Sequence, residues 1–275
     1  MIDLHIHTTA TPHHSTWVPE ELAVTAAQSG LLAIAATDHN TTASVLALQA
    51  AGKRHGVQVI AGVEIDSGFN NKLWHTLVYG VAPDEPRLLQ LCQAVFDRNM
   101  ADARALQNHL IDQRFRLDDL EKLDRPCNVA DVATALARQN TLPYRNPNEN
   151  NESAGMRYII TQMPQGYNPV GVDEVIEVAH QCGGVAVLAH PGRAKGIYAI
   201  PATEEDIIKM AEMGLDGIEV LYPTHTREDR IFYSHLAKRY HLLVTGGSDS
   251  HHPHQPLANW PSDDVAVFLK RMNIL

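Results

Sequence analysis

Histidine is unusually frequent in this chain of 275 residues, with 16 copies, and several of them stand close to acidic residues. His5 and His7 lie two positions apart in the run DLHIH. On an extended strand, side chains two apart point to the same face, and two neutral imidazoles on one face can chelate a divalent metal such as zinc, manganese or iron. A His-x-His pair also arises by chance, so this pair indicates a metal site only if other ligands accompany it.

Further potential ligands stand where short apolar runs end. They are Asp38 and His39 after 31–37, Glu64 after 57–63, His190 after 184–189, and Asp249 and His251 after 242–246. In α/β barrels, active sites assemble at the carboxyl ends of the strands. Buried, hydrogen-bonded histidines or surface loops could account for any one of these positions, but not for the whole set. The set therefore predicts a metal site.

Two further histidines fit this pattern less well. His75 stands at the start of its expected strand, 74–80, so either this strand runs antiparallel or its boundary lies elsewhere. His13 lies in a loop beside His14, and the sequence leaves open which of the two faces the site. A ligand role for His13 or His75 therefore depends on how these segments fold.

The elements that must position these residues alternate between short apolar runs and helical stretches. The expected strands are 2–7, 31–37, 57–63, 74–80, 184–189, 216–221 and 242–246, and the expected helices are 19–29, 42–54, 172–182, 203–213 and 226–240. This alternation predicts an α/β fold with a largely parallel sheet, and seven strands favour a barrel over an open sheet.

One segment, residues 84–167, breaks this alternation. Residues 84–140 indicate two or three helices, and 143–170 carry many Pro, Asn and Gly residues that indicate a long irregular loop. A structureless loop of this length is uncommon unless it has a function. We therefore expect a mostly helical insertion with a lid-like loop at 84–167, between barrel halves at 1–83 and 168–275.

The bulk composition narrows the function classes. The formal net charge of -10 disfavours an extended grip on nucleic acid, although a locally positive site could still bind a small anion. The three cysteines are far apart and form no CxxC motif, which is typical of the reducing cytoplasm. No apolar run approaches the roughly 18 residues that span a membrane, and the first residues indicate a strand rather than a signal peptide. We expect a cytoplasmic protein with no membrane partner.

The runs DLHIHTTA, TDHN, GVEI, AHPGR and GGSDSH resemble, in order and spacing, the successive motifs of the PHP (polymerase and histidinol phosphatase) family. The resemblance covers almost the whole chain, except part of the insertion. It implies a distorted (β/α)7 barrel, a centre of two or three metal ions (manganese, zinc or iron) and phosphoesterase activity.

The resemblance also implies a ligand set. His5, His7, Glu64 and Asp249 would hold a first metal, Glu64 would bridge to a second held by His75 and His190, and His13, His39 and His251 would hold a third. The insertion and the run GIEVLYPTHT resemble the subgroup that hydrolyses small nucleotide or sugar phosphates. Many members of that subgroup carry an aspartate and a glycine where this chain has Pro12-His13. His13 instead resembles the third-site histidine of histidinol-phosphatase-like members, which leaves both the substrate and the choice between two and three metals open.

The chemistry that we expect is direct attack on phosphorus by a metal-bridging hydroxide, because two nearby metals lower the pKa of bound water to about 7. Arg193 could grip phosphate oxygens, and His225 could bind phosphate or protonate the leaving oxygen. Asp3 and Asp38 would orient the ligand histidines by hydrogen bonds. Arg157, near Tyr144 in the insertion, is the preferred lid residue to contact substrate, although it could equally lie on the surface.

Several functions stay open at this stage. The leading hypothesis is hydrolysis of a phosphate monoester or small diester of a nucleotide or sugar. One alternative is a 5'-3' exonuclease on short oligonucleotides, which would need a basic groove; another is a non-catalytic metal-binding module, which would be expected to have lost ligands. Amidohydrolase-type enzymes also begin with His-x-His, but they usually add a lysine at a later strand end, and none stands at such a position here. The specific ester, the native metal and the oligomeric state are not determined by the sequence.

Overall fold

The computed structural model describes residues 1–11, 15–143, 145–194 and 200–275. Eight strands in these ranges form one sheet. Its order is β1 (Ile2–Ile6), β2 (Ala33–Ala36), β3 (Gln58–Phe69), β4 (Lys72–Tyr79), β6 (Val185–Leu188), β7 (Gly217–Leu221) and β8 (Leu243–Gly246), with the short β5 (Val170–Gly171) paired to β3. All neighbouring pairs are parallel except those of β4, which runs antiparallel to both β3 and β6. This is the largely parallel sheet that the sequence predicts.

The two ends of the sheet meet between β1 and the segment that follows β8. The Asp249 N–H donates to the carbonyl of His5 at 2.8 Å, and the His7 N–H donates to the carbonyl of Ser250 at 2.9 Å. Gly247 allows this approach, because a Cβ atom there would lie 2.2 Å from the Cβ of His5. The sheet therefore curls so that its first strand approaches the segment after its last strand.

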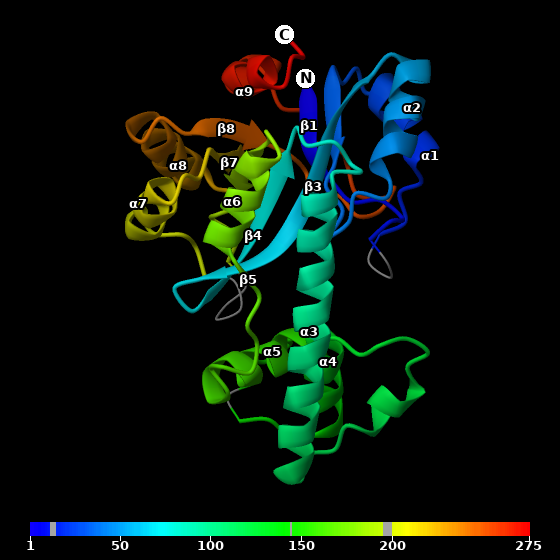
Figure 1. Cartoon of the computed structure of the whole chain (residues 1–275), viewed down its shortest axis with the longest axis vertical. Helices are drawn as coiled ribbons and strands as arrows, with labels where there is room; N and C mark the ends of the chain where they lie inside the picture. The colour runs from blue at the N-terminus through cyan, green and yellow to red at the C-terminus, as the bar shows by residue number, and fades with distance from the viewer. Residues whose placement is uncertain (12–14, 144, 195–199) are drawn as a thin grey trace.

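Helices cover the outside of this sheet (Figure 1). They are α1 (Pro19–Gln28), α2 (Val45–His55), α6 (Val172–Gln181), α7 (Glu204–Glu212), α8 (Arg227–Arg239) and α9 (Ala266–Arg271). Local sequence explains several of their ends: Thr203 and Thr226 form capping boxes at the starts of α7 and α8, and Gly56 ends α2 in the left-handed conformation. The sequence did not predict α9, and helix α2 begins three residues later than expected.

The hairpin of β3 and β4 is longer than the sequence predicts. Strand β3 continues to Phe69 rather than ending at residue 63, so Glu64 lies within the strand and not after it. The turn consists of Asn70 and Asn71, both with positive φ (53° and 56°), as in the two-residue turns that match the twist of a hairpin. Because β4 runs back from this turn, its start lies at the same end of the sheet as the carboxyl ends of the parallel strands.

The insertion comprises α3 (Pro86–Asp112), a 3₁₀ helix (Asp118–Lys122), α4 (Val129–Gln139) and α5 (Asn151–Gln162). It projects from one end of the barrel in Figure 1. Its second half corrects the sequence prediction, because α5 occupies part of the segment 143–170 that was expected to be an irregular loop. Asn150 begins this helix by accepting a hydrogen bond from the Ser153 N–H, so the Asn-rich composition marks a helix start here.

The insertion has a hydrophobic core of its own. Leu106 and Leu110 from α3 pack there with Leu136 from α4 and Ile159 from α5. The earlier part of α3 instead packs into the barrel core, together with residues of α6. Among the described helices, none is long and apolar enough to cross a membrane.

Candidate metal centre

Eight of the nine residues expected to bind metal converge at one end of the sheet. They are His5 and His7 on or just after β1, His39 after β2, Glu64 on β3, His75 on β4, His190 after β6, and Asp249 and His251 after β8. The ninth, His13, lies outside the described residues. His75 lies at this end of the sheet because β4 runs antiparallel to β3. It pairs in register with Asp66, two residues beyond Glu64. The expectation that this strand could run antiparallel is therefore confirmed.

The carboxylate of Glu64 lies at the middle of the cluster and is fully buried. Five histidine nitrogens surround it: His75 Nδ1 at 2.9 Å, His190 Nε2 at 3.2 Å and His5 Nε2 at 3.3 Å from Oε1, and His7 Nε2 and His39 Nδ1 both at 3.2 Å from Oε2. Burial alone would raise the pKa of Glu64, but the surrounding histidines hold it well below its usual value. Each oxygen thus faces a different group of nitrogens, which is the arrangement that a bridging ligand requires.

Asp249 supplies the second carboxylate of the cluster. Its Oδ1 lies 3.1 Å from His7 Nε2 and 3.6 Å from His5 Nε2. Its Oδ2 accepts a hydrogen bond from the Tyr222 hydroxyl at 2.9 Å and lies 3.5 Å from the Arg193 guanidinium. One oxygen therefore faces the histidines, while the other is held by groups on the barrel rim.

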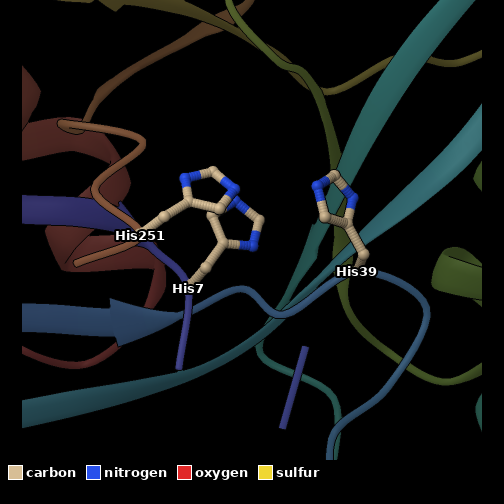
Figure 2. A group of neighbouring side chains, drawn as sticks. All are labelled: His7, His39 and His251. Atoms are coloured by element: carbon tan, nitrogen blue, oxygen red, sulfur yellow. The ribbon is translucent and has the colours of Figure 1, made fainter. Parts of the chain in front are cut away.

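The rings of His251 and His39 both lie close to the ring of His7 (Figure 2). The His251 and His7 ring centroids are 4.1 Å apart, and those of His39 and His7 are 4.5 Å apart. His251 Nδ1 lies 2.8 Å from the carbonyl oxygen of Asp249, which can only accept, so this nitrogen carries the proton and Nε2 keeps its lone pair. The three rings can thus each offer one nitrogen to an ion between them, within 4.8 Å of one another.

The donor atoms fit divalent metal ions. His7 Nδ1, His39 Nδ1, His75 Nδ1 and Glu64 Oε2 are buried and form no hydrogen bond of suitable geometry with the residues that the structure describes, even though His39 Nδ1 and His75 Nδ1 lie close to Glu64. Buried polar atoms normally have such partners, because leaving one without a partner costs about 1–3 kcal/mol. Imidazole nitrogens and carboxylate oxygens are the donors that zinc, manganese and iron accept. Two of the groups able to hold an ion are His5-His7-Glu64-Asp249, as the sequence predicts for the first metal, and His39-Glu64-His75.

The surroundings raise the pKa of some histidines of the cluster and lower that of others. Burial lowers the pKa of His7, but hydrogen bonds and charge from Asp249 and Glu64 outweigh it and raise the pKa to about 9. The same balance, with Glu219 as the leading carboxylate, raises the pKa of His5 well above its usual value. For His190, burial dominates and lowers the pKa to about 4. Metal binding would displace protons from His5 and His7, whose pKa values are raised, as expected for ligands that must be deprotonated.

Two carboxylates of the cluster were not found by sequence reasoning. Glu219 on β7 is fully buried, and both of its oxygens lie near His5 Nδ1, at 3.1 and 3.2 Å. Asp66 Oδ1 lies 3.3 Å from His39 Nδ1 and 3.5 Å from His75 Nε2. The sequence did hold a signal for Glu219, because it is the single acidic residue in the apolar run GIEVL. Period-two alternation along a strand can direct such a side chain to the inner face of the sheet. Asp66 lies two residues after Glu64, so it shares the face of Glu64 once the strand is known to continue.

Asp3 and Asp38 make contacts that differ from the expected ones. Asp3 accepts backbone hydrogen bonds from Ser248 at 2.9 Å and Ala258 at 2.7 Å, and a longer one from His5 at 3.4 Å. Asp38 accepts from the backbone and hydroxyl of Thr8, and from other hydroxyls nearby. Both carboxylates therefore hold the backbone of loops that carry predicted ligands, rather than the imidazole rings.

His225 also has contacts other than those expected for a proton donor. It is buried, and its Nδ1 lies 2.9 Å from the carbonyl of Val220 while its Nε2 accepts from the Gly192 N–H at 3.0 Å. Both ring nitrogens are thus engaged with backbone in this geometry. Because Gly192 precedes Arg193, His225 instead holds the turn that presents this arginine to the cluster.

Arg157 and Arg193, the two arginines expected to bind substrate, lie in different surroundings. Arg193 lies beside Asp249 at the metal cluster, as described above. Arg157 forms a two-pronged ion pair with Glu149 inside the insertion, with nitrogen–oxygen distances of 2.6 and 3.0 Å. Tyr144 lies outside the described residues. The structure therefore brings Arg193 to the site but gives Arg157 a partner within the insertion.

Comparison with known proteins shows the family. The PHP domain model matches residues 3–215. A phosphoribosyl 1,2-cyclic phosphate 1,2-diphosphodiesterase from Eggerthella lenta is 31% identical over 90% of this chain and 93% of its own. A 5'-3' exoribonuclease from Haemophilus influenzae is 27% identical over 91% and 90% of the two chains, and a 3',5'-nucleoside bisphosphate phosphatase from Chromobacterium violaceum is 26% identical over 92% and 87%.

Solved structures show the same fold. A structure from Chromobacterium violaceum, described as an amidohydrolase, covers 99% of this chain and 96% of its own with a TM-score of 0.73 and 24% identity. One from Bifidobacterium adolescentis, described as a metal-dependent phosphoesterase, covers 98% and 96% with a TM-score of 0.70 and 25% identity. The chain therefore belongs to the PHP domain family, and it is a hydrolase of that family's metal-dependent phosphoesterase type.

Proposed function

We propose that this enzyme hydrolyses a phosphate ester of a small nucleotide or sugar phosphate, a monoester or small diester, at a centre of two or three divalent ions. The observation that carries the proposal is the position of Glu64, whose two oxygens face separate groups of histidine nitrogens at 2.9 to 3.3 Å. A carboxylate so placed can hold two ions at once. Paired ions of this kind are typical of enzymes that transfer phosphoryl groups to water.

The ligand set that we propose is the one implied by the family resemblance, and the positions of the donors support it. His5, His7 and Asp249 would share the first ion with Glu64, and His75 and His190, which both lie near Glu64 Oε1, would hold the second together with Glu64. His39 and His251 face a third position, for which His13 is the remaining expected ligand. When bound, such ions lower the pKa of water and neutralise charge on phosphate oxygens, and manganese, zinc and iron all suit these donors.

Arg193 would bind and orient the phosphate. Its side chain is partly exposed, and its guanidinium lies 3.5 Å from Asp249 Oδ2 at the edge of the cluster. A planar guanidinium can offer two parallel N–H donors to a phosphate, which fixes its orientation as well as its position. Tyr222 donates to the same carboxylate oxygen and would keep Asp249 turned toward the histidines.

The substrate class is inferred from three considerations. The net charge of -10 does not favour long nucleic acids, whereas the cluster can attract a compact anion by its local charge. One relative acts on a sugar cyclic phosphate and another on a nucleoside bisphosphate, according to their names. A second candidate is removal of nucleotides from the 5' end of short RNA, supported by the relative from Haemophilus influenzae.

The test is a panel of four substrates at equal concentration: a ribose 1,2-cyclic phosphate, a nucleoside 3',5'-bisphosphate, a short 5'-phosphorylated RNA and a simple aryl phosphate. We expect the highest kcat/KM on one of the first two, abolished by chelation and restored by manganese, zinc or iron. Processive shortening of RNA with little turnover of small esters would favour the second candidate. Hydrolysis of amides with no phosphate release, or activity that survives complete metal removal, would contradict the proposal.

A further inference from the structure

Glu219 is a fully buried carboxylate that contacts two different predicted metal ligands. Its oxygens lie 3.1 and 3.2 Å from His5 Nδ1, and its Oε2 also accepts the backbone N–H of His190 at 2.8 Å. His5 lies on β1 and His190 follows β6, so this one side chain joins residues from opposite parts of the sheet. Glu219 is not itself one of the predicted metal ligands.

The contact with His5 determines which nitrogen of this ring faces the cluster. A carboxylate can only accept, so His5 Nδ1 carries the proton. Once metal binding displaces the proton of His5 Nε2, this nitrogen would offer its lone pair on the side that faces Glu64, at 3.3 Å, and Asp249, at 3.6 Å. A histidine that ligates a metal commonly donates its other N–H to a carboxylate, which fixes the ring and increases its basicity.

The contact with His190 holds an unusual backbone. His190 has a φ of +27°, in the region that residues other than glycine rarely adopt. Such a conformation persists only where its surroundings hold it. The hydrogen bond from the His190 N–H to Glu219 is one of these restraints, and it sets the direction in which this side chain leaves the strand end.

From these two contacts we infer that Glu219 is a positioning residue that couples the first and second metal sites, by orienting the His5 ring and the His190 backbone together. The inference rests on the proposed metal centre. The hydrogen bonds of Glu219 go to His5 and His190, so it acts through these two histidines. Loss of its carboxylate is expected to weaken both sites at once.

The experiment compares Glu219→Gln and Glu219→Ala with the unchanged chain, all stripped of metal and titrated with manganese and cobalt(II) against a competing chelator. We expect Glu219→Ala to lose about 10–100-fold in metal affinity, the usual effect of removing such a partner, and Glu219→Gln to lose less. Glutamine keeps one acceptor oxygen but puts an amide N–H₂ where the other oxygen was, so it cannot serve both contacts equally. The visible absorption of bound cobalt should also change at saturation, because the ring orientation changes.

Asp206→Asn serves as the matched control. Asp206 is also a buried carboxylate, but it caps α7 and pairs with Lys72. This variant should lower thermal stability and leave metal affinity and the cobalt spectrum unchanged. A purely structural role of Glu219 would give the same result as the control and would overturn the inference.

The outcomes are separable. If the unchanged chain binds no metal, the proposed function fails. If it binds metal and both Glu219 variants match its affinity and cobalt spectrum, the inference alone fails. If Glu219→Ala does not fold, Glu219→Gln decides, because glutamine preserves the volume of the side chain.

Discussion

Replacement of Glu64 by glutamine is the sharpest test of the proposed centre. The change preserves the shape of the side chain and removes one negative charge from a fully buried position. Five histidine nitrogens lie within 3.3 Å of this carboxylate, so any ion held among them would lie close to it. The variant therefore removes the charge that two ions are expected to share.

The magnitude follows from Coulomb's law. Two unit charges about 4 Å apart interact by about 4 kcal/mol at an effective dielectric constant of about 20. A divalent ion carries two such charges. Even if the variant loses only the attraction calculated for a single unit charge, about 4 kcal/mol, the metal affinity should fall about a thousand-fold, since about 1.4 kcal/mol corresponds to a factor of ten. The neutral amide would also present an N–H₂ group to nitrogens that need an acceptor.

The assay measures bound metal by mass spectrometry after gel filtration in metal-free buffer, together with phosphate release from the best substrate. We expect Glu64→Gln to retain its fold by circular dichroism, to lose the second ion at micromolar metal, and to be inactive. Glu177→Gln is the matched control, because it makes the same chemical change on the exposed surface of α6. A Glu64→Gln protein that keeps both its metal and its activity would refute the assignment of Glu64 as the bridging ligand.

Three further results are expected. Arg193→Ala should lower kcat/KM about 10–100-fold, which is the equivalent of losing a charged hydrogen bond worth about 1.5–3 kcal/mol. Arg193→Lys should recover only part of the lost kcat/KM. Equal kcat/KM values for the unchanged enzyme and both variants would contradict the phosphate-binding role of Arg193. The metal-free protein should lose stability as pH rises from about 6.5 to 9, because the raised pKa of His7 stabilises the fold only while His7 is protonated. It should also lose stability as pH falls below about 6.5. There the lowered pKa of His190 means that the unfolded chain binds a proton more readily than the folded one. Metal should suppress both effects in thermal melts. Gly155→Ala should destabilise the insertion by about 1–3 kcal/mol in urea unfolding, because its Cβ would lie 1.9 Å from the carbonyl oxygen of Ala133, and it should leave metal affinity unchanged.

Much of the barrel could be predicted from the sequence because its signals are local. Most of the parallel strands are short apolar runs followed by polar residues, and the carboxyl ends of parallel strands meet at one edge. His190 and Asp249 were therefore found without knowledge of the fold. Glu64 was found from the same pattern, although β3 continues past it to Phe69. His75 was found as a candidate, but only the antiparallel direction of β4 explains its place.

What the sequence could not predict depends on contacts between distant residues. Glu219 meets His5 across 214 positions of the chain, and an apolar pattern gives the face of a strand but not the partner opposite it. His225 was interpreted as a phosphate ligand or a proton donor because it follows a strand, whereas its two backbone hydrogen bonds are visible only in three dimensions. The length of the β3–β4 hairpin depended on Asn70 and Asn71, whose positive φ values allow a tight turn without glycine.

The reversed strand β4 has a consequence for the reach of the enzyme. Since β4 begins beside the metal centre, it leads the chain to the opposite end of the barrel. Helix α3, the first element of the insertion, must then run back before α4 and α5 can follow. The 27 residues of α3 span about 40 Å as a continuous helix that packs first on the barrel, through Leu91, and then in the insertion, through Leu110 (Figure 1). The length of this helix thus sets the separation between insertion and metals, and with it the size of any ligand that touches both. Adding or removing one turn would change that span by about 5.4 Å without altering a single metal ligand.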